Sequence, residues 1–203
     1  MICFYFLVLL LILVVMFAII FAIFLSKISP EKYSKFCAKK VRNLARKKSL
    51  LYLDDVNLVN FDKEHIYVDQ IIFGKKYIYL VTDIKLNGFV SGDACDNSWI
   101  YYNRKEKKHK YIANLNELAK DNIKEVSTLL GVDSAPFVSI CLISNNCDFK
   151  IKNQNRNESH IVHFLSLKRK IRHLEKSKIN SLDEEQIYEE YKRVKETNVQ
   201  ERN

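Results

Sequence analysis

Residues 67–85 have the sequence YVDQIIFGKKYIYLVTDIK, in which two runs of β-branched and aromatic residues flank a short polar segment. Such runs predict two neighbouring β-strands, Ile66–Phe73 and Tyr77–Ile84, in one sheet. An acid lies inside each strand, Asp69 in the first and Asp83 in the second. Because an unpaired carboxylate is costly to bury, we expect both acids to be paired, hydrogen-bonded or bound to a metal ion.

The connection between the two strands decides which side chains share a face of the sheet. If the three residues after Phe73 form a tight hairpin loop, Phe73 lies opposite Tyr77. Alternation of side chains along each strand then places Asp69, Asp83 and Lys85 on the same face. Two carboxylates and an ammonium group would converge there.

This trio suits metal-assisted hydrolysis of a phosphodiester. Two carboxylates can hold Mg²⁺ or Mn²⁺, the metal can polarise a phosphate oxygen and acidify a water, and a lysine can orient that water or stabilise developing charge. The spacing Asp-x(13)-Asp-x-Lys also matches the PD-(D/E)xK nuclease signature. The alternative for the same three residues is a salt-bridged strand end at a solvated rim of the sheet.

The N-terminal segment predicts a membrane anchor. Residues 2–25 contain no charge and are almost all apolar, which is enough helix to cross a hydrocarbon core of about 30 Å. The segment lacks the basic start, short apolar core and cleavage site of a signal peptide, so we expect a retained single span. The residues that follow are strongly basic, and basic residues beside a span stay on the cytoplasmic side. We therefore expect a single-pass protein of the cell membrane with its C-terminal domain in the cytoplasm.

The basic excess is concentrated beside this predicted anchor. Nine basic residues and one acid, Glu31, lie between Lys27 and Leu50, and they account for +8 of the chain's net charge of +9. The remaining domain is close to neutral, so the net charge by itself is no evidence for nucleic-acid binding. We interpret residues 27–48 as a contact for anionic lipid headgroups.

Several common chemistries lack their motifs in this chain. The four glycines form no phosphate-cradling cluster, and there is no Gly-x-Ser-x-Gly elbow, so a Walker loop, a dinucleotide fingerprint and a serine-hydrolase site are not indicated. The five histidines and five cysteines do not combine at zinc-ligand spacing. The scattered, odd-numbered cysteines predict free thiols.

Periodicity predicts the other elements of an α/β domain. Leu115–Leu130 should be a helix that ends at Gly131 as its C-cap. A C-terminal helix should begin at a capping box formed by Ser181-Leu-Asp-Glu184. Further strands are predicted at Leu51–Leu58, Trp99–Tyr102, Phe137–Ile143 and Ile161–Leu165.

A second basic run, Arg104-Lys-Glu-Lys-Lys-His-Lys110, follows one of these strands. Such a run is typical of a solvated loop. Beside a nuclease site, its residues Lys105, Lys107 and Lys108 are the candidates for contact with nucleic-acid phosphates.

The stretch from Leu50 to about Cys147 resembles a NERD domain, a nuclease-related domain often found beside membrane segments in bacteria. Several motifs of that family occur here in the same order. They are Tyr52–Leu58 for the opening strand, Val68–Gly74 and Tyr77–Lys85 for the two acid-bearing strands, Gly88, Val90, Gly92 and Trp99 for the glycine-rich segment that follows, Asn114 for the start of the next helix, and Phe137–Ile143 for the next core strand.

The resemblance implies a restriction-endonuclease-like fold, with a central mixed sheet flanked by helices and preceded by one transmembrane helix. It implies Asp69 and Asp83 as ligands of Mg²⁺ or Mn²⁺, and Lys85 as the catalytic lysine. The chain departs from the family in two ways that touch this site. Asp83 replaces the usual Glu, and residues 32–53 contain no acid where the family's first helix usually supplies one.

These observations predict a chain in four parts and a membrane-anchored, Mg²⁺-dependent nuclease that hydrolyses nucleic-acid phosphodiester bonds. The parts are a transmembrane helix at residues 1–26, a basic juxtamembrane helix at 27–50, a NERD-like domain at 51–165 and a helical C-terminal tail at 166–203.

Two other functions stay open on the sequence. The first is a catalytically inactive, membrane-tethered module that uses the same fold to bind DNA, RNA or a protein partner. The second is a structural protein that assembles through an apolar stripe of the C-terminal helix, formed by Tyr188, Tyr191 and Val194.

Overall fold

The computed structural model describes residues 7, 9–17, 19–20, 30–59, 63, 65–133, 135–154 and 160–198. The chain divides into two compact units, residues 1–35 and residues 36–203. In the predicted apolar span, residues 7, 9–17 and 19–20 are helical, and the other positions of residues 2–25 lie outside the described residues. No helix in the described part of the chain is long and apolar enough to cross a membrane.

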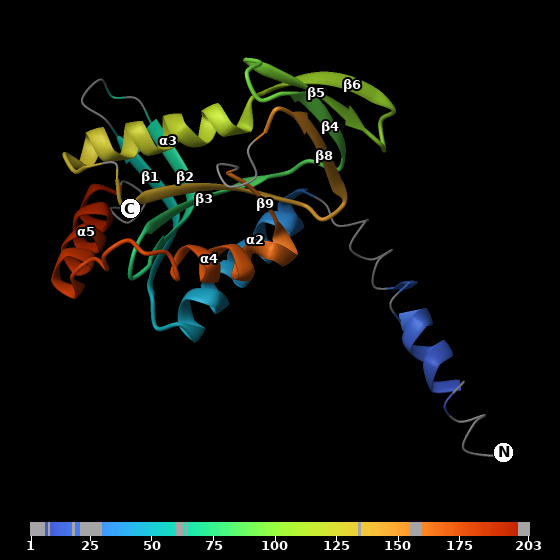
Figure 1. The fold of residues 1–203 in the computed structure, drawn as a ribbon, viewed down its shortest axis with the longest axis horizontal. Helices are drawn as coiled ribbons and strands as arrows, with labels where there is room; N and C mark the ends of the chain where they lie inside the picture. The colour runs from blue at the N-terminus through green and yellow to red at the C-terminus, as the bar shows by residue number, and fades with distance from the viewer. Residues whose placement is uncertain are drawn as a thin grey trace. The chain divides into compact units, whose positions relative to one another are not determined.

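The larger sheet of the second unit has five strands in the order β1-β2-β3-β7-β9 (Figure 1). The first three strands are antiparallel neighbours, whereas β7 runs parallel to β3 and β9 parallel to β7. The predicted α/β fold with a mixed sheet flanked by helices is therefore confirmed. The strands are β1 (Leu51–Val59), β2 (His65–Phe73), β3 (Ile78–Ile84), β7 (Phe137–Ile143) and β9 (Ile161–His163).

A smaller, four-stranded sheet has the order β6-β5-β4-β8. Its first three strands form an antiparallel meander between β3 and α3, and β8 joins β4 in parallel. Parallel neighbours such as β3 and β7 need a long crossover connection, and this meander together with α3 forms it. The strands are β4 (Gly88–Asp93), β5 (Ser98–Asn103), β6 (Lys108–Ala113) and β8 (Cys147–Lys152).

The helices cover both faces of the larger sheet. Figure 1 shows α3 across one face, and α2 and α4 side by side across the other. Phe36 of α2 packs against Phe164 just before α4, with 5.2 Å between the ring centroids. The helices are α2 (Pro30–Lys47), α3 (Leu115–Leu130), the 3-10 turn η1 (Phe164–Ser166), α4 (Leu167–Leu174) and α5 (Glu184–Thr197).

The C-terminal helix α5 belongs to the core of this unit. Val194 is 1 % exposed in the cluster formed by β1, β2, β3 and α3, and Tyr191 meets Phe73 edge-on at 5.5 Å between ring centroids. Tyr188 is 60 % exposed. Two of the three residues in the predicted assembly stripe therefore pack within their own chain, which removes the basis for assembly through that stripe.

The hairpin between β2 and β3 differs from the prediction by one residue. Phe73 pairs with Ile78, not with Tyr77, so the loop has four residues. The loop is closed by a hydrogen bond from the Gly74 backbone N–H to the Tyr77 carbonyl at 2.9 Å. The predicted three-residue loop was wrong, because this internal bond takes Tyr77 out of the strand.

Helix ends were predicted with mixed success. Helix α3 has the predicted bounds and ends at Gly131, which adopts a left-handed conformation with φ 65°. Helix α5 begins two residues later than a capping box at Ser181 would place it. Asp183 is the N-cap instead, and the Gln186 side chain accepts a hydrogen bond from the Asp183 N–H. The predicted capping box at Ser181 was therefore wrong.

Candidate functional site

The Asp69 carboxylate reaches across from β2 to β3. Its Oδ2 accepts a hydrogen bond from the backbone N–H of Asp83 at 2.8 Å. This bond lies just beyond Gln70 and Val81, the last residues paired between the two strands. The two acids of the signature are thus brought together at the point where β2 and β3 separate.

The Asp83 side chain is held on the face of the sheet that α2 and α4 cover. It follows Tyr79 and Val81 at alternate positions of β3, and the Tyr79 hydroxyl bonds to Glu175 at the end of α4 at 2.6 Å. Asp83 is 7 % exposed, and its Oδ2 accepts from the Gln70 side-chain amide at 3.1 Å. Gln70, itself 2 % exposed, is a member of the site that the sequence analysis missed.

An irregularity in β1 and β2 aims the Asp69 side chain. Leu53 and Val56 of β1, and Val68 and Ile71 of β2, belong to one core cluster although each pair is three positions apart. Strict alternation would put the two residues of such a pair on opposite faces of the sheet. The alternation of side chains is therefore interrupted between them in both strands, which we call a change of phase. Asp55 lies at this point of β1 with φ 49°, a left-handed conformation. Irregularities of this kind re-aim side chains beside active sites.

This irregularity corrects the predicted geometry. With the observed pairing, strict alternation would put Asp69 and Asp83 on opposite faces of the sheet. The change of phase in β2 instead turns the Asp69 carboxylate onto the backbone of Asp83. The Asp69 carboxylate thus contacts the Asp83 backbone N–H, and the predicted alternation of side chains does not account for this contact.

Electrostatics at Asp69 oppose its ionisation. Burial raises the pKa of this carboxyl above its ordinary value, and the facing Asp55 carboxylate raises it further. The hydrogen bond from the Asp83 N–H and the positive charge of Lys85 lower the pKa in part. Because burial is the largest of these effects, a cation placed beside Asp69 would relieve an unfavourable negative charge.

Lys85 follows the last residue of β3 and has an exposed side chain. Its ammonium group lies near enough to Asp69 to act on that carboxyl electrostatically. Of the three predicted residues, Asp69 is hydrogen-bonded to the backbone of Asp83, and the charge of Lys85 lowers the pKa of the Asp69 carboxyl.

The donor set suits a magnesium ion in part. Within the described residues, no group of three or more His, Cys, Asp or Glu side chains is arranged to hold a metal ion. Mg²⁺, however, is usually bound through one or two carboxylates, with waters and substrate phosphates as the other ligands. Asp69 and Asp83 are the two carboxylates that the sequence analysis predicted for such a site, and the contact between them is the hydrogen bond from the Asp83 N–H to the Asp69 carboxylate.

Helix α2, which precedes β1, begins before residues 32–53, the stretch that contains no acid. Helix α2 starts at Pro30, so Glu31 lies in its first turn. The side chain of Glu31 lies outside the described part of the structure. An acid of the first helix is thus present in the sequence of α2, although not within residues 32–53.

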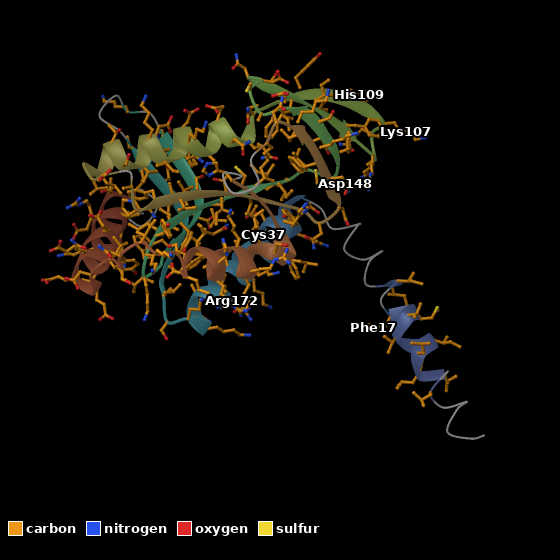
Figure 2. All side chains as sticks on the ribbon, viewed as in Figure 1. Phe17, Cys37, Lys107, His109, Asp148 and Arg172 are labelled. Atoms are coloured by element: carbon orange, nitrogen blue, oxygen red, sulfur yellow. The ribbon has the colours of Figure 1, made fainter. Side chains whose placement is uncertain are left out.

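The predicted phosphate contacts lie on the smaller sheet. Lys105 and Lys107 lie in the turn between β5 and β6 and Lys108 begins β6, and all three side chains are exposed. Figure 2 shows Lys107 at the tip of this hairpin. The neighbouring Arg104 is paired with Asp148 of β8 at 2.6 Å. These lysines therefore lie on the smaller sheet, whereas the two acids lie on β2 and β3 of the larger sheet.

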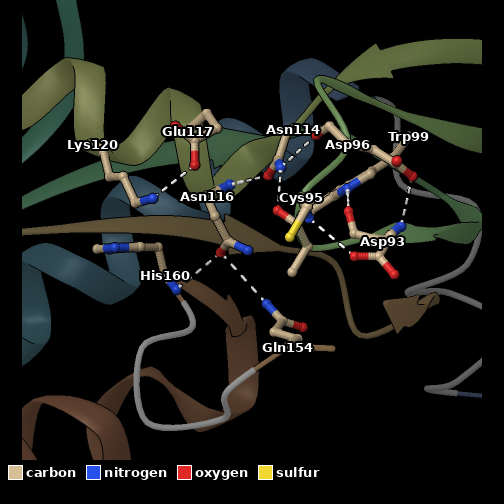
Figure 3. A network of polar contacts seen from close by, with 11 residues as sticks. Asp93, Cys95, Asp96, Trp99, Asn114, Asn116, Glu117, Lys120, Gln154 and His160 are labelled. Carbon is tan, nitrogen blue, oxygen red and sulfur yellow. Dashed lines mark hydrogen bonds and ion pairs between the residues drawn. The ribbon is translucent and has the colours of Figure 1, made fainter. Parts of the chain in front are cut away.

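A polar network at the start of α3 joins the helix to the turn between β4 and β5 (Figure 3). Asn114 is 1 % exposed and caps α3 by accepting from the Asn116 N–H. Its amide also donates to the carbonyls of Ala94 at 3.0 Å and Asp96 at 2.8 Å. The residue predicted to open this helix is thus its N-cap and fixes α3 to the smaller sheet.

Replacing Asn114 by alanine should lower the free energy of unfolding by about 2 kcal/mol, because the variant loses a helix cap and leaves two carbonyls without their donor. Urea denaturation of the full-length chain measures this loss. Asn97→Ala, at an exposed asparagine of the adjoining turn, should change stability by less than about 0.5 kcal/mol. Equal losses in the two variants would contradict the role of this cap.

No model of a known protein family, no characterised protein and no solved structure matches the chain.

Proposed function

We propose that the chain is a membrane-anchored, NERD-like protein whose restriction-endonuclease-like domain hydrolyses nucleic-acid phosphodiester bonds with Mg²⁺ or Mn²⁺. The observation that carries this proposal is the contact between Asp69 and Asp83. The Asp69 carboxylate lies 2.8 Å from the Asp83 backbone nitrogen on the neighbouring strand, and Lys85 follows two residues later. Asp69 lies in the middle of β2 and Asp83 near the end of β3, just beyond the last paired residues of these two strands of a mixed sheet flanked by helices.

In this proposal Asp69 and Asp83 would hold the metal, and Lys85 would act on the reacting groups. When bound, the metal supplies a Lewis acid for the scissile phosphate and acidifies a water. Gln70 fixes the Asp83 carboxylate by donating to its Oδ2, and the Asp83 N–H fixes the Asp69 carboxylate. Lys85, whose side chain is exposed, would orient the water or stabilise charge on the phosphate.

The membrane part of the proposal rests on the sequence of residues 2–25, which contains no charge. Residues 27–48 follow with their excess of lysine and arginine, which anionic headgroups attract. We propose a single-pass protein of the cell membrane with the domain on the cytoplasmic side. The nucleic acid would then be cut near the membrane surface.

A cleavage assay tests the enzymatic part directly. The full-length chain in mild detergent is incubated with single- and double-stranded DNA and RNA, with Mg²⁺, Mn²⁺ or a chelator. We expect metal-dependent loss of at least one of the four substrates and none in the chelator. Absence of cleavage from every substrate with either metal would reject the nuclease.

One observation favours the catalytically inactive binding module as the second candidate. Asp83 is 7 % exposed, and its carboxylate already accepts a hydrogen bond from Gln70. A carboxylate so placed has little room for a hydrated ion. Nucleic-acid binding that is unchanged by a chelator, without cleavage, would support this second function.

A further inference from the structure

Helix α4 presents a row of cations that the sequence analysis did not single out. Its inner side is apolar, since Leu167 and Ile171 are both fully buried. Its sequence, LKRKIRHL, contains no acid, and basic residues continue in the turn that follows. The exposed basic residues of α4 and this turn are Lys168, Arg169, Arg172, His173, Lys176 and Lys178.

The one acid in this stretch is turned inward and does not offset the row. Glu175 Oε1 accepts from the Tyr79 hydroxyl at 2.6 Å. Its Oε2 accepts from the backbone N–H of Lys75 at 3.2 Å. The outer side of α4 therefore carries an unbalanced positive charge.

Helix α2 extends this surface. Figure 1 shows α2 beside α4, and Lys40 of α2 lies 3.9 Å above the ring of Phe164. From Phe36 onward α2 buries apolar residues such as Cys37 and Val41, while its basic residues Lys39, Arg46 and Lys47 are exposed. We call the exposed basic residues of the two helices the α2–α4 cationic face.

Two large apolar side chains are exposed at the edge of this face. Leu165, in the turn before α4, is 68 % exposed, and Phe36 of α2 is 43 % exposed. Both adjoin Phe164, Leu165 through the chain and Phe36 through a ring contact. Exposed leucine and phenylalanine amid lysine and arginine are the composition of surfaces that lie in a membrane interface.

We propose that the α2–α4 cationic face docks the domain onto an anionic lipid bilayer, with Leu165 and Phe36 entering the headgroup layer. This places the α2 and α4 side of the sheet toward the bilayer and the α3 side toward water. The proposal adds α4 to the lipid contact expected from residues 27–48, and it relies on the proposed anchor for the high local concentration of lipid.

Two features favour lipid over nucleic acid as the occupant. An apolar side chain gains nothing from a phosphodiester backbone but gains from the acyl boundary of a bilayer. In addition, α2 begins at Pro30, only a few residues after the uncharged segment ends at Leu25. The cations of α2 are therefore next in sequence to the residues proposed to cross the membrane.

Tryptophan quenching tests this docking. The chain has one tryptophan, Trp99, which is fully buried, so Leu165→Trp adds a reporter at the proposed contact. The full-length variant is reconstituted into vesicles of brominated neutral lipid, with or without an anionic fraction of about a third. We expect strong quenching of the new tryptophan only in the anionic vesicles, and its loss at high salt.

Charge reversal shows whether α4 is responsible. Adding Lys168→Glu, Arg169→Glu and Arg172→Glu should lower the quenching at least about threefold, because each cation contributes to binding at an anionic surface. The matched control, Lys120→Glu, Lys124→Glu and Lys195→Glu on α3 and α5, should leave quenching unchanged. A milder set, with glutamine at the same three positions of α4, should give an intermediate loss if the glutamate set folds poorly.

Three results would overturn the proposal. They are equal quenching in neutral and anionic vesicles, equal loss in the α4 and control variants, and loss of DNA or RNA binding in the α4 variant with quenching retained. The last would assign the face to nucleic acid. Failure of the anchor is distinguishable, because the chain would then float with anionic vesicles and not with neutral ones.

Discussion

Asp83→Asn should lower metal-dependent cleavage by about 100-fold or more, while the protein stays folded. The change removes one of two carboxylates proposed to hold the metal, and loss of such a group weakens metal binding and charge stabilisation together. Asparagine has nearly the same shape, and its side-chain oxygen can still accept the hydrogen bond from Gln70. The fold should therefore tolerate the change better than the chemistry does.

Initial rates on the substrate that the wild-type chain cuts fastest measure this effect. Asp121→Asn is the matched control, since Asp121 is exposed on α3, away from β2 and β3. The control should cleave at the wild-type rate. If Asp83→Asn keeps the wild-type rate, Asp83 has no part in catalysis and the proposed mechanism fails.

Trp99→Ala should lower the free energy of unfolding by about 3–5 kcal/mol. Trp99 is fully buried in the smaller sheet, where its indole N–H donates to the Asp93 carbonyl at 2.8 Å. Its ring meets Phe149 edge-on, and it lies so close to Gly92 that a Cβ on that glycine would come within 2.4 Å of it. Removing the ring would leave a cavity between β4, β5 and α3 and an unpaired carbonyl.

Thermal and urea unfolding measure this loss, and Trp99→Phe separates its two causes. Phenylalanine keeps most of the buried area but loses the hydrogen bond, so this variant should lose about 1–2 kcal/mol. A loss below about 1 kcal/mol for Trp99→Ala would show that the smaller sheet is not packed around this residue.

The sequence predicted those helices and strands that their own residue pattern marks, such as a helical repeat of apolar residues or an apolar run. The bounds of α3 and β7 follow directly from an amphipathic helix that ends at Gly131 and from an apolar run of seven residues. The strands β4, β6 and β8 were not predicted. β6 reads KHKYIA and is almost wholly exposed, so no alternation of apolar residues marks it, and only pairing with β5 makes it a strand.

The sequence proposed the residues of the candidate site and did not predict their geometry. The pattern of acids and a lysine identified Asp69, Asp83 and Lys85, but the register between β2 and β3 depends on a loop that closes on itself. The contact of the Asp69 carboxylate with the Asp83 backbone depends further on the left-handed Asp55 in β1 and the break in alternation beside it. Those features arise from contacts between strands, which local sequence does not record.

Binding of Mn²⁺ tests the central claim most directly, because it asks whether the two acids form a metal site irrespective of any substrate. Calorimetric titration of the full-length chain should show one ion bound per chain. Asp69→Asn and Asp83→Asn should each weaken this binding at least about tenfold, and Asp121→Asn should leave it unchanged. The account is contradicted if the wild-type chain binds no Mn²⁺. It is also contradicted if both acid variants bind Mn²⁺ as tightly as the wild-type chain does.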